Sequence, residues 1–310
     1  MPRRATPPPT RYAYQLWDVF TDTRLSGNPL AVLPDAQGLS GETMQALAQE
    51  FNLSETSFLL PSKSADVHAR YFTPHQELPM AGHPSIGSVY ALEHLGRASG
   101  DELTLKLAIG PVTMRLERGD EGLERVWMDQ GVPSFGQRYP NRAKVAALLN
   151  LEETDLDPAL PVQEVSAGVP FVIVAVNSLG ALGHARLTET SLAALMGDEP
   201  RAILVVTRHV GSDKGGSDEE ARVRARMLGL AVGVVEDPAT GSAHGPLGAY
   251  LARYGGLELS ATLRTTFVSH QGVEMGRPSR IDVEVTQTPD GFRVAVGGSA
   301  VLVGEGTLYL

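Results

Sequence analysis

The sequence carries one phrase twice, and this repeat restricts the possible folds more than any other feature. The first copy is residues 77–82 (ELPMAG), and the second is residues 236–241 (EDPATG), 159 positions later. Each copy continues as an apolar segment that stops at a glycine, Gly96 in the first copy and Gly255 in the second. A shared spacing of this length indicates two copies of one structural unit.

Each copy predicts a strand, a tight turn and a helix. The proline and glycine favour a turn, and the closing glycine stands where a helix C-cap is expected. The apolar residues between them recur at helical spacing; they are Ile86, Val89 and Tyr90 in the first copy and Leu247, Tyr250, Leu251 and Tyr254 in the second. A helix N-terminus offers free N–H groups that favour an anion, so two of them can hold one small acid.

The alternative is that both copies are ordinary glycine-rich helix starts, which are common. The repetition favours a binding site, and so do the polar residues at the turns. These are His83 in the first copy and Asp237, Ser242 and His244 in the second.

Composition excludes several classes of protein. A chain of 310 residues suggests about two domains, and its net charge of −10 argues against nucleic acid or an anionic membrane surface as a partner. The chain has no cysteine, so it has neither disulfides nor thiolate nucleophiles. No segment has the roughly 18 apolar residues of a membrane span, and residues 1–10 lack the apolar region of a secretory signal. We expect a disordered leader at residues 1–10 and a cytoplasmic protein.

The order of the predicted elements indicates an α+β fold with antiparallel or mixed sheets, since few helices separate the strands. Ser40 predicts the N-cap of an amphipathic helix at residues 41–51. The second half is expected to begin with a linker at 131–140, followed by a helix at 142–150. A short helix at 191–196 and a loop at 211–218 are also predicted.

Motifs spread over nearly the whole chain resemble the phenazine-biosynthesis PhzF-like family. They are residues 18–20 (DVF), 27–32 (GNPLAV), 53–56 (LSET), 81–84 (AGHP), 236–243 (EDPATGSA), 271–272 (QG) and 275–279 (MGRPS). The resemblance implies the diaminopimelate-epimerase-like fold, with two similar domains that are each a barrel-like, mostly antiparallel sheet around a central helix. It also implies an active site in the cleft between them and a homodimer. The domains expected are residues 11–130 with 292–310, and residues 131–291.

The resemblance implies one carboxylate as the base. Epimerases of this fold place a cysteine at each helix start, but the matching positions here hold Ala81 and Thr240. Two-base racemisation by thiols is therefore excluded. PhzF-like proteins use the glutamate of the Leu-Ser-Glu-Thr phrase, here Glu55, as general acid/base. Without the resemblance, a glutamate exposed at a strand edge would be the simpler interpretation.

The other predicted site residues come from the repeated phrase. His83 and Asp237 join Glu55 as catalytic residues, and Gly82, Gly241 and Ser242 are expected to bind substrate. Capping is the alternative role for His83, Asp237 and Ser242. His75 and His244 are weaker candidates, because a lone histidine is more often structural. No metal-ligand spacing or nucleotide motif is present, so neither a metal nor a cofactor is expected.

Three functions remain in competition. The first is a PhzF-like isomerase that shifts a proton and a double bond in a small unsaturated carboxylic or amino acid. The second is a cysteine-free epimerase on the same fold, and the third is a non-catalytic protein that binds a small acid. Joint presence of Glu55, His83, Asp237 and Ser242 favours the isomerase, since stability alone needs none of them. The sequence does not identify the substrate.

Overall fold

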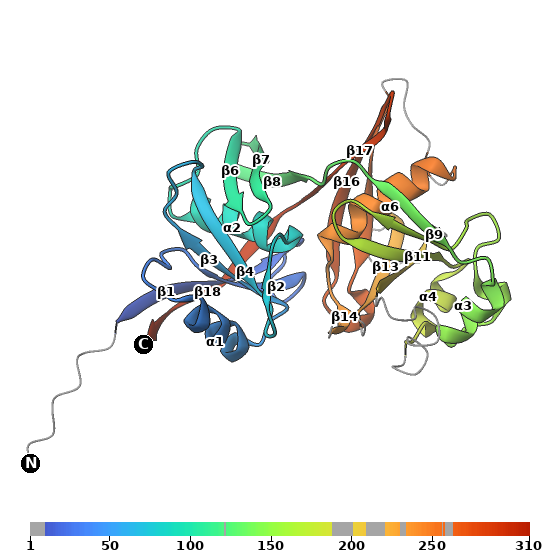
Figure 1. The fold of residues 1–310 in the computed structure, drawn as a ribbon, viewed down its shortest axis with the longest axis horizontal. Helices are drawn as coiled ribbons and strands as arrows, with labels where there is room; N and C mark the ends of the chain where they lie inside the picture. The colour runs from blue at the N-terminus through green and yellow to red at the C-terminus, as the bar shows by residue number, and fades with distance from the viewer. Residues whose placement is uncertain are drawn as a thin grey trace, which may run out of the picture.

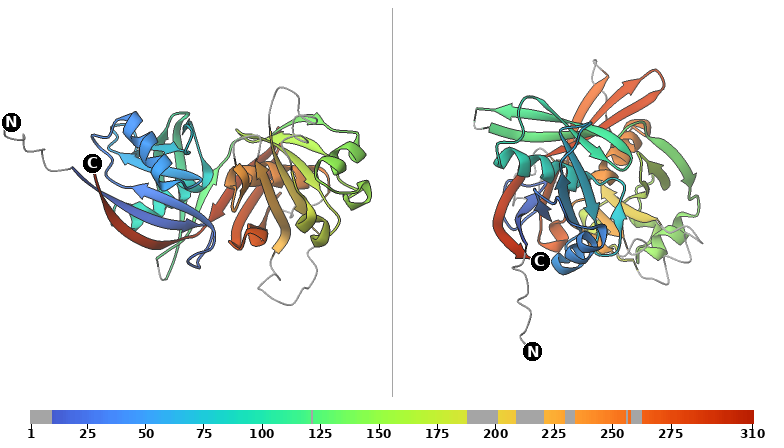
Figure 2. Two further views of the ribbon diagram at one scale, coloured as in Figure 1. Left: turned by 90° about the horizontal axis from the view of Figure 1, so that it is seen from below. Right: turned by 60° about the vertical axis from the view of Figure 1, so that its left-hand side comes forward.

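The computed structural model describes residues 10–120, 122–187, 201–208, 221–229, 234–255, 257 and 263–310. They form two β-rich lobes joined side by side (Figure 1, Figure 2). Most strand pairs are antiparallel, and few helices intervene. The predicted α+β class is confirmed.

The first lobe is built from β1 to β8, with β18 at its edge. Its strands β1, β2, β3 and β4 pair in that order, with β2–β3 parallel and the other two pairs antiparallel. β4 pairs in parallel with β6, and β6, β7 and β8 then form an antiparallel run. The bounds are β1 Arg11–Val19, β2 Asn28–Leu33, β3 Glu55–Leu60, β4 Val67–Phe72, β5 Glu77–Leu78, β6 Glu102–Leu107, β7 Gly110–Gly119, β8 Gly122–Asp129 and β18 Ala300–Tyr309.

The second lobe repeats this pattern strand for strand. β10 to β17 pair as β1 to β8 do, with parallel pairs at β11–β12 and β13–β15 and antiparallel pairs elsewhere. The bounds are β9 Ser134–Arg138, β10 Gln163–Ser166, β11 Pro170–Ala175, β12 Ala202–Thr207, β13 Ala221–Gly229, β14 Val234–Asp237, β15 Arg264–Gln271, β16 Ser279–Thr288 and β17 Gly291–Gly298. The repeated phrase is therefore the local sign of a repeat in the whole topology.

The two lobes exchange their edge strands. β9 follows β8 along the chain but pairs with β10 of the second lobe, and β18 follows β17 but pairs with β1 of the first. β17 also pairs with β8, which joins the two sheets directly. Residues 131–140, predicted to be a linker, instead contain β9, because its backbone completes the edge of the second sheet. We propose the predicted two-domain division with one change: the chain returns to the first lobe at β18, which pairs with β1, whereas β17 pairs with β16 of the second lobe.

One central helix fills each lobe. α2 spans Gly82–His94 and α6 spans Gly241–Arg253, 13 residues each, in the register that the repeat predicts. α2 is buried on every side from Gly82 to Leu92. A helix buried all round requires small and apolar residues on every face. Its two serines are paired, since Ser85 contacts the Tyr71 hydroxyl at 3.0 Å and Ser88 contacts Ser57 at 2.6 Å.

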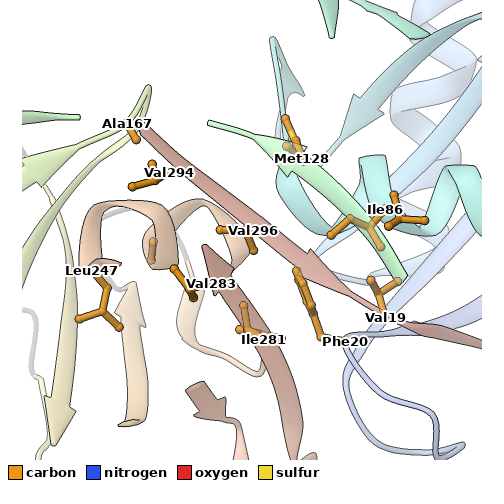
Figure 3. Packing of buried hydrophobic residues seen from close by; sticks show 14 of the residues in the cluster. Val19, Phe20, Ile86, Met128, Ala167, Leu247, Ile281, Val283, Val294 and Val296 are labelled. Carbon is orange, nitrogen blue, oxygen red and sulfur yellow. The ribbon is translucent and has the colours of Figure 1, made fainter. Parts of the chain in front are cut away.

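The apolar core runs without a break from one lobe to the other. Phe20, directly after β1, lies between residues of the first lobe such as Val19 and residues of the second such as Val296 and Ile281 (Figure 3). Its backbone has a positive φ of 65°. This conformation is costly for a bulky residue. The neighbouring amides hold it, since Phe20 N donates to Ser299 O and Phe20 O accepts from Arg280 N.

The remaining helices are short and lie outside the sheets. α1 spans Gly41–Phe51, and Ser40 caps it as predicted by accepting from Thr43 N at 3.1 Å. α3 spans Arg142–Leu148 and α4 spans Leu179–His184, with 3₁₀ turns η1 Glu153–Asp155 and η3 Val273–Met275. The predicted helix at 191–196 and loop at 211–218 lie outside the described residues. No helix among those described is both long and apolar enough to cross a bilayer.

Candidate active site

The N-termini of the two central helices meet. A methyl group placed on Gly82, the first residue of α2, would lie 3.2 Å from the amide nitrogen of Ser242 and 3.5 Å from Cα of Gly241. Glycine at both helix starts permits this approach. A cavity of about 640 Å³ opens beside this contact, and residues from both lobes line it. Its lining includes Asn52–Glu55, Thr73–Gln76, Leu78–His83, Val169–Phe171, Arg201, Ala202, Met227, Asp237 and Thr240–Ser242.

Glu55 begins β3 and is one of the residues that line this cavity. The side chain is 18% exposed, and its Oε2 lies 3.4 Å from Nε2 of His83. Neither of these two atoms has a hydrogen-bond partner within the described residues. Burial, and next the negative charge of Asp237, raises the pKa of Glu55 to about 8. A carboxyl group with such a pKa can both accept and donate a proton near neutral pH.

His83, the second residue of α2, is buried and faces Glu55. Burial lowers its pKa to about 3, so the imidazole is neutral at physiological pH. Its position in the first helical turn acts in the same direction, because the positive end of the helix dipole opposes a cation. The histidine is therefore not the positive partner of an ion pair with Glu55.

Asp237 ends β14 and enters the same cluster from the second lobe. Its carboxylate accepts from the Thr240 hydroxyl at 2.5 Å, from Asn28 Nδ2 at 2.9 Å and from the Ser54 hydroxyl at 3.2 Å. Burial raises the pKa of Asp237 to about 6, and these three hydrogen bonds oppose the rise. Two carboxyl groups with raised pKa values thus share one buried region.

The predicted binding residues also line the cavity. Gly82 and Gly241 lie at the helix contact, and Ser242 is the next residue of α6. Ser242 does not cap α6, because the N-cap residue of this helix is Thr240. His244, by contrast, is fully buried inside the second lobe, where its ring nitrogens contact Thr240 O and the Ser269 hydroxyl. Its role is structural, whereas the weaker candidate His75 lies on the cavity wall.

Sequence reasoning assigned no role to three residues that complete the cluster. Asn28 joins the two lobes by donating to Asp237 and to Ala239 O. Ser54 donates to Asp237, and Gln271 holds the turn before α6 through Thr240 N, Thr240 Oγ1 and Asp237 O. All three stand inside the motifs that carry the family resemblance, which was the available signal.

Comparison with known proteins places the chain in a family. The family model described as "Phenazine biosynthesis-like protein" matches residues 17–306. The chain belongs to this family.

Relatives of this phenazine-biosynthesis-like protein are isomerases. A trans-2,3-dihydro-3-hydroxyanthranilate isomerase from Pseudomonas aeruginosa is 35% identical over 96% of this chain and 100% of its own length. An uncharacterised isomerase from Mesorhizobium japonicum is 37% identical over 96% of this chain and 98% of its own length. A solved PhzF-family protein from Bacillus anthracis superposes with a TM-score of 0.88 at 30% identity, covering 97% of this chain and 100% of the other.

These likenesses show that the chain is an enzyme, an isomerase of the PhzF-like family. They agree with the cluster of titratable groups in the cavity. A group of three or more metal-ligating side chains is absent from the part of the chain that the structure describes.

Proposed function

We propose that the enzyme moves a proton and a double bond within a small unsaturated carboxylic or amino acid, with Glu55 as the general acid/base. One observation carries this proposal. Glu55 lines the cavity where the two helix N-termini meet, and one oxygen of its carboxyl group is buried without a hydrogen-bond partner among the described residues. An unsatisfied buried acceptor is costly in a folded protein, so its retention calls for a function.

The proton transfer proceeds in two steps. The Glu55 carboxylate takes a proton from one carbon of the substrate, so that a C–H bond breaks and an O–H bond forms. The freed electron pair shifts along the unsaturated system, and the Glu55 carboxyl then returns the proton to another carbon. Atoms and electrons balance without an oxidant or a reductant.

The remaining residues bind the substrate and hold its charge. The amides at Gly82 and Gly241 and the Ser242 hydroxyl would bind a carboxylate of the substrate, a role supported by the meeting of two helix N-termini beside one cavity. Asp237 would hold an amino group of the substrate when ionised. His83 faces the same oxygen of Glu55 and is a third group near the reacting atoms.

The relatives suggest the first substrate to test. The Pseudomonas aeruginosa relative is named for trans-2,3-dihydro-3-hydroxyanthranilate, a cyclic unsaturated amino acid. A cavity of about 640 Å³ is within the usual size range of small-ligand sites and accommodates a single ring. We infer that this compound and related β,γ-unsaturated amino and hydroxy acids are the substrate class.

Isomerisation in heavy water tests the proposal. Deuterium is expected at the carbon that receives the proton, and Glu55→Gln is expected to lower kcat by about 10²-fold or more, because removal of a general acid/base has this order of effect. Glu50→Gln is the matched control, since Glu50 is exposed on α1 outside the cavity.

Isomerisation that persists unchanged in Glu55→Gln would remove Glu55 from this role. Exchange of an α-proton with racemisation would support an epimerase instead, and tight binding without turnover would support a binding protein.

We further propose that the enzyme is a cytoplasmic homodimer. The resemblance to PhzF-like proteins supports this proposal. Light scattering at several concentrations measures the mass of the particle. A mass of 33.0 kDa at all concentrations would contradict a dimer.

A further inference from the structure

Asn28, the first residue of β2, lies at the centre of the cluster but outside the substrate cavity's lining. It is fully buried. Its Nδ2 atom lies 2.9 Å from Asp237 Oδ1, 2.9 Å from Ala239 O and 3.4 Å from Nδ1 of His83. One amide nitrogen therefore faces groups from both central-helix turns.

The orientation of this amide is fixed by its neighbours. The oxygen of Ala239 is a backbone carbonyl and accepts hydrogen bonds at every pH. Turning the Asn28 amide over would place oxygen against this carbonyl and against the Asp237 carboxylate. The atom next to His83 is therefore the NH₂ group. The side-chain oxygen of Asn28 has no partner within the described residues, so the hydrogen bonds of the NH₂ group alone orient this amide.

The proton on His83 follows from this orientation. The two hydrogens of the Asn28 NH₂ group serve Asp237 Oδ1 and Ala239 O at 2.9 Å, and His83 Nδ1 lies 3.4 Å from the same nitrogen. A proton on Nδ1 would find no acceptor there, because an amide nitrogen does not accept hydrogen bonds, so Nδ1 presents a lone pair. The neutral ring then carries its proton on Nε2, which is the atom 3.4 Å from Glu55 Oε2. We propose that Asn28 is a positioning residue that holds His83 in the Nε2–H tautomer, with this Nε2 atom 3.4 Å from Glu55 Oε2.

This tautomer limits where the Glu55 proton can go, a consequence that rests on the proposed function of Glu55. An imidazole already protonated on Nε2 cannot accept a proton from Glu55 at that atom. His83 therefore presents an N–H and not a lone pair to Glu55, 3.4 Å away, and does not take the proton from it. The Glu55 proton is therefore not passed on through His83.

The loop before Asn28 is held by hydrogen bonds from the second lobe. Arg277 donates to Ser26 O at 2.7 Å and to Gly27 O at 2.8 Å, and Gly27 N donates to Pro278 O. Gly27 has φ +65°, and a Cβ there would lie 2.3 Å from Val19 O. The backbone before Asn28 therefore has little freedom, as a positioning role requires.

Nitrogen-15 NMR of the histidine rings tests the tautomer directly, without a substrate. The long-range proton–nitrogen spectrum of protein labelled in its eight histidines distinguishes a protonated from an unprotonated ring nitrogen. The His83 signal is assigned by its loss in His83→Asn. We expect Nε2 protonated and Nδ1 unprotonated at pH 7 in the wild type. A proton on Nδ1 would overturn the inference, whatever the activity.

Two substitutions test whether Asn28 is the cause. Asn28→Ala removes the donor and is expected to give a mixture of tautomers. Asn28→Asp replaces the donor by an acceptor of the same shape and is expected to place the proton on Nδ1. Circular dichroism checks that each variant folds, and Asn177→Ala, which removes an exposed Asn bond to Thr154 O, is the control. An unchanged His83 signal in a folded Asn28→Ala protein would refute the assignment.

Steady-state kinetics of Asn28→Ala tests whether the His83 tautomer matters for catalysis. Asn28→Ala is expected to lower kcat by about 10²-fold, as misplacement of a catalytic group does, with KM changed much less because Asn28 does not line the cavity. A wild-type kcat despite a changed tautomer would show that the tautomer has no catalytic role. Full activity in Glu55→Gln would refute the proposed function instead, and the NMR result would stand.

Discussion

At the scale of single residues, the proposed role of Glu55 predicts how the reaction depends on pH. Its pKa is raised to about 8, chiefly by burial and then by the charge of Asp237. The first step needs the carboxylate, so kcat/KM is expected to rise about tenfold per pH unit up to about pH 8 and to level off above it. We call the pH at which this rise ends the limb of the profile. A pH–rate profile checks this expectation, and a flat profile from pH 6 to 9 would contradict it.

The same profile tests the coupling to Asp237. Asp237→Asn removes the negative charge that helps to raise the Glu55 pKa, so the limb is expected to move to lower pH while total activity falls. Burial is the larger cause, so the limb should not return to the ordinary value of 4.5. Asp22→Asn, an exposed aspartate outside the cavity, should leave the limb in place. A limb that moved upward in Asp237→Asn would show that the two carboxyl groups do not interact as described.

Glu55 also reduces stability at high pH. Because its pKa is higher in the native state than the ordinary 4.5, the native state holds this proton more tightly than the unfolded chain does. The resulting stabilisation is complete below about pH 4.5 and is lost as pH rises through about 8. Glu55→Gln should therefore gain stability relative to the wild type between pH 6 and pH 9, measured by urea unfolding. An equal difference in unfolding free energy between the two proteins at pH 6 and at pH 9 would argue against a raised pKa of Glu55.

Sequence reasoning could find the site residues that belong to motifs, but not the partners of each residue. Glu55, His83, Asp237 and Ser242 were predicted as one site, and the structure places all four around one cavity. Asn28 received no role because its contacts join positions 55 to 211 residues apart in the chain. No local pattern encodes such a contact.

At the scale of elements, the close approach of α2 and α6 depends on glycine. The methyl group of Gly82→Ala would meet Ser242 N at 3.2 Å, which is tighter than ordinary packing and forces the helix starts apart by a few tenths of an ångström. We expect kcat/KM to fall about tenfold or more, since small displacements of catalytic groups have large effects. Gly183→Ala is the control, because no atom lies within 4 Å of its added methyl group. Equal kinetics for the two variants would show that the helix contact does not position the site.

The elements that sequence could predict are those with a local signal. The repeat predicted α2 and α6 in the correct register, and Ser40 predicted the start of α1. β9 was missed because Ser134–Arg138 is mostly exposed and has no apolar alternation, so only its pairing with β10 makes it a strand. The exchange of β9 and β18 is likewise a long-range property that short patterns do not contain.

At the scale of the whole molecule, the two lobes are tied together at the site itself. The strand exchange, the shared core around Phe20 and the contacts of Arg277 all cross between them. Because half of the proposed machinery comes from each lobe, relative movement of the lobes would separate Glu55 and His83 from Asp237 and Ser242. Under the proposed function, the contacts between the lobes are therefore needed for catalysis as well as for stability.

Arg277 offers the sharpest test of this coupling. Its guanidinium group contacts Asp18 Oδ1 at 2.6 Å, and Asp18 is only 4% exposed. Arg277→Met leaves that buried carboxylate without its cation, which costs about 3–5 kcal/mol of unfolding free energy. Arg97→Met, which breaks an exposed pair with Asp35, should cost about 1 kcal/mol or less. Urea unfolding measures both losses, and kcat/KM should fall in Arg277→Met alone because Arg277 also holds the loop before Asn28. Similar losses of stability in the two variants, or unaltered kinetics in Arg277→Met, would mean that the Arg277–Asp18 contact does not fix the position of one lobe relative to the other.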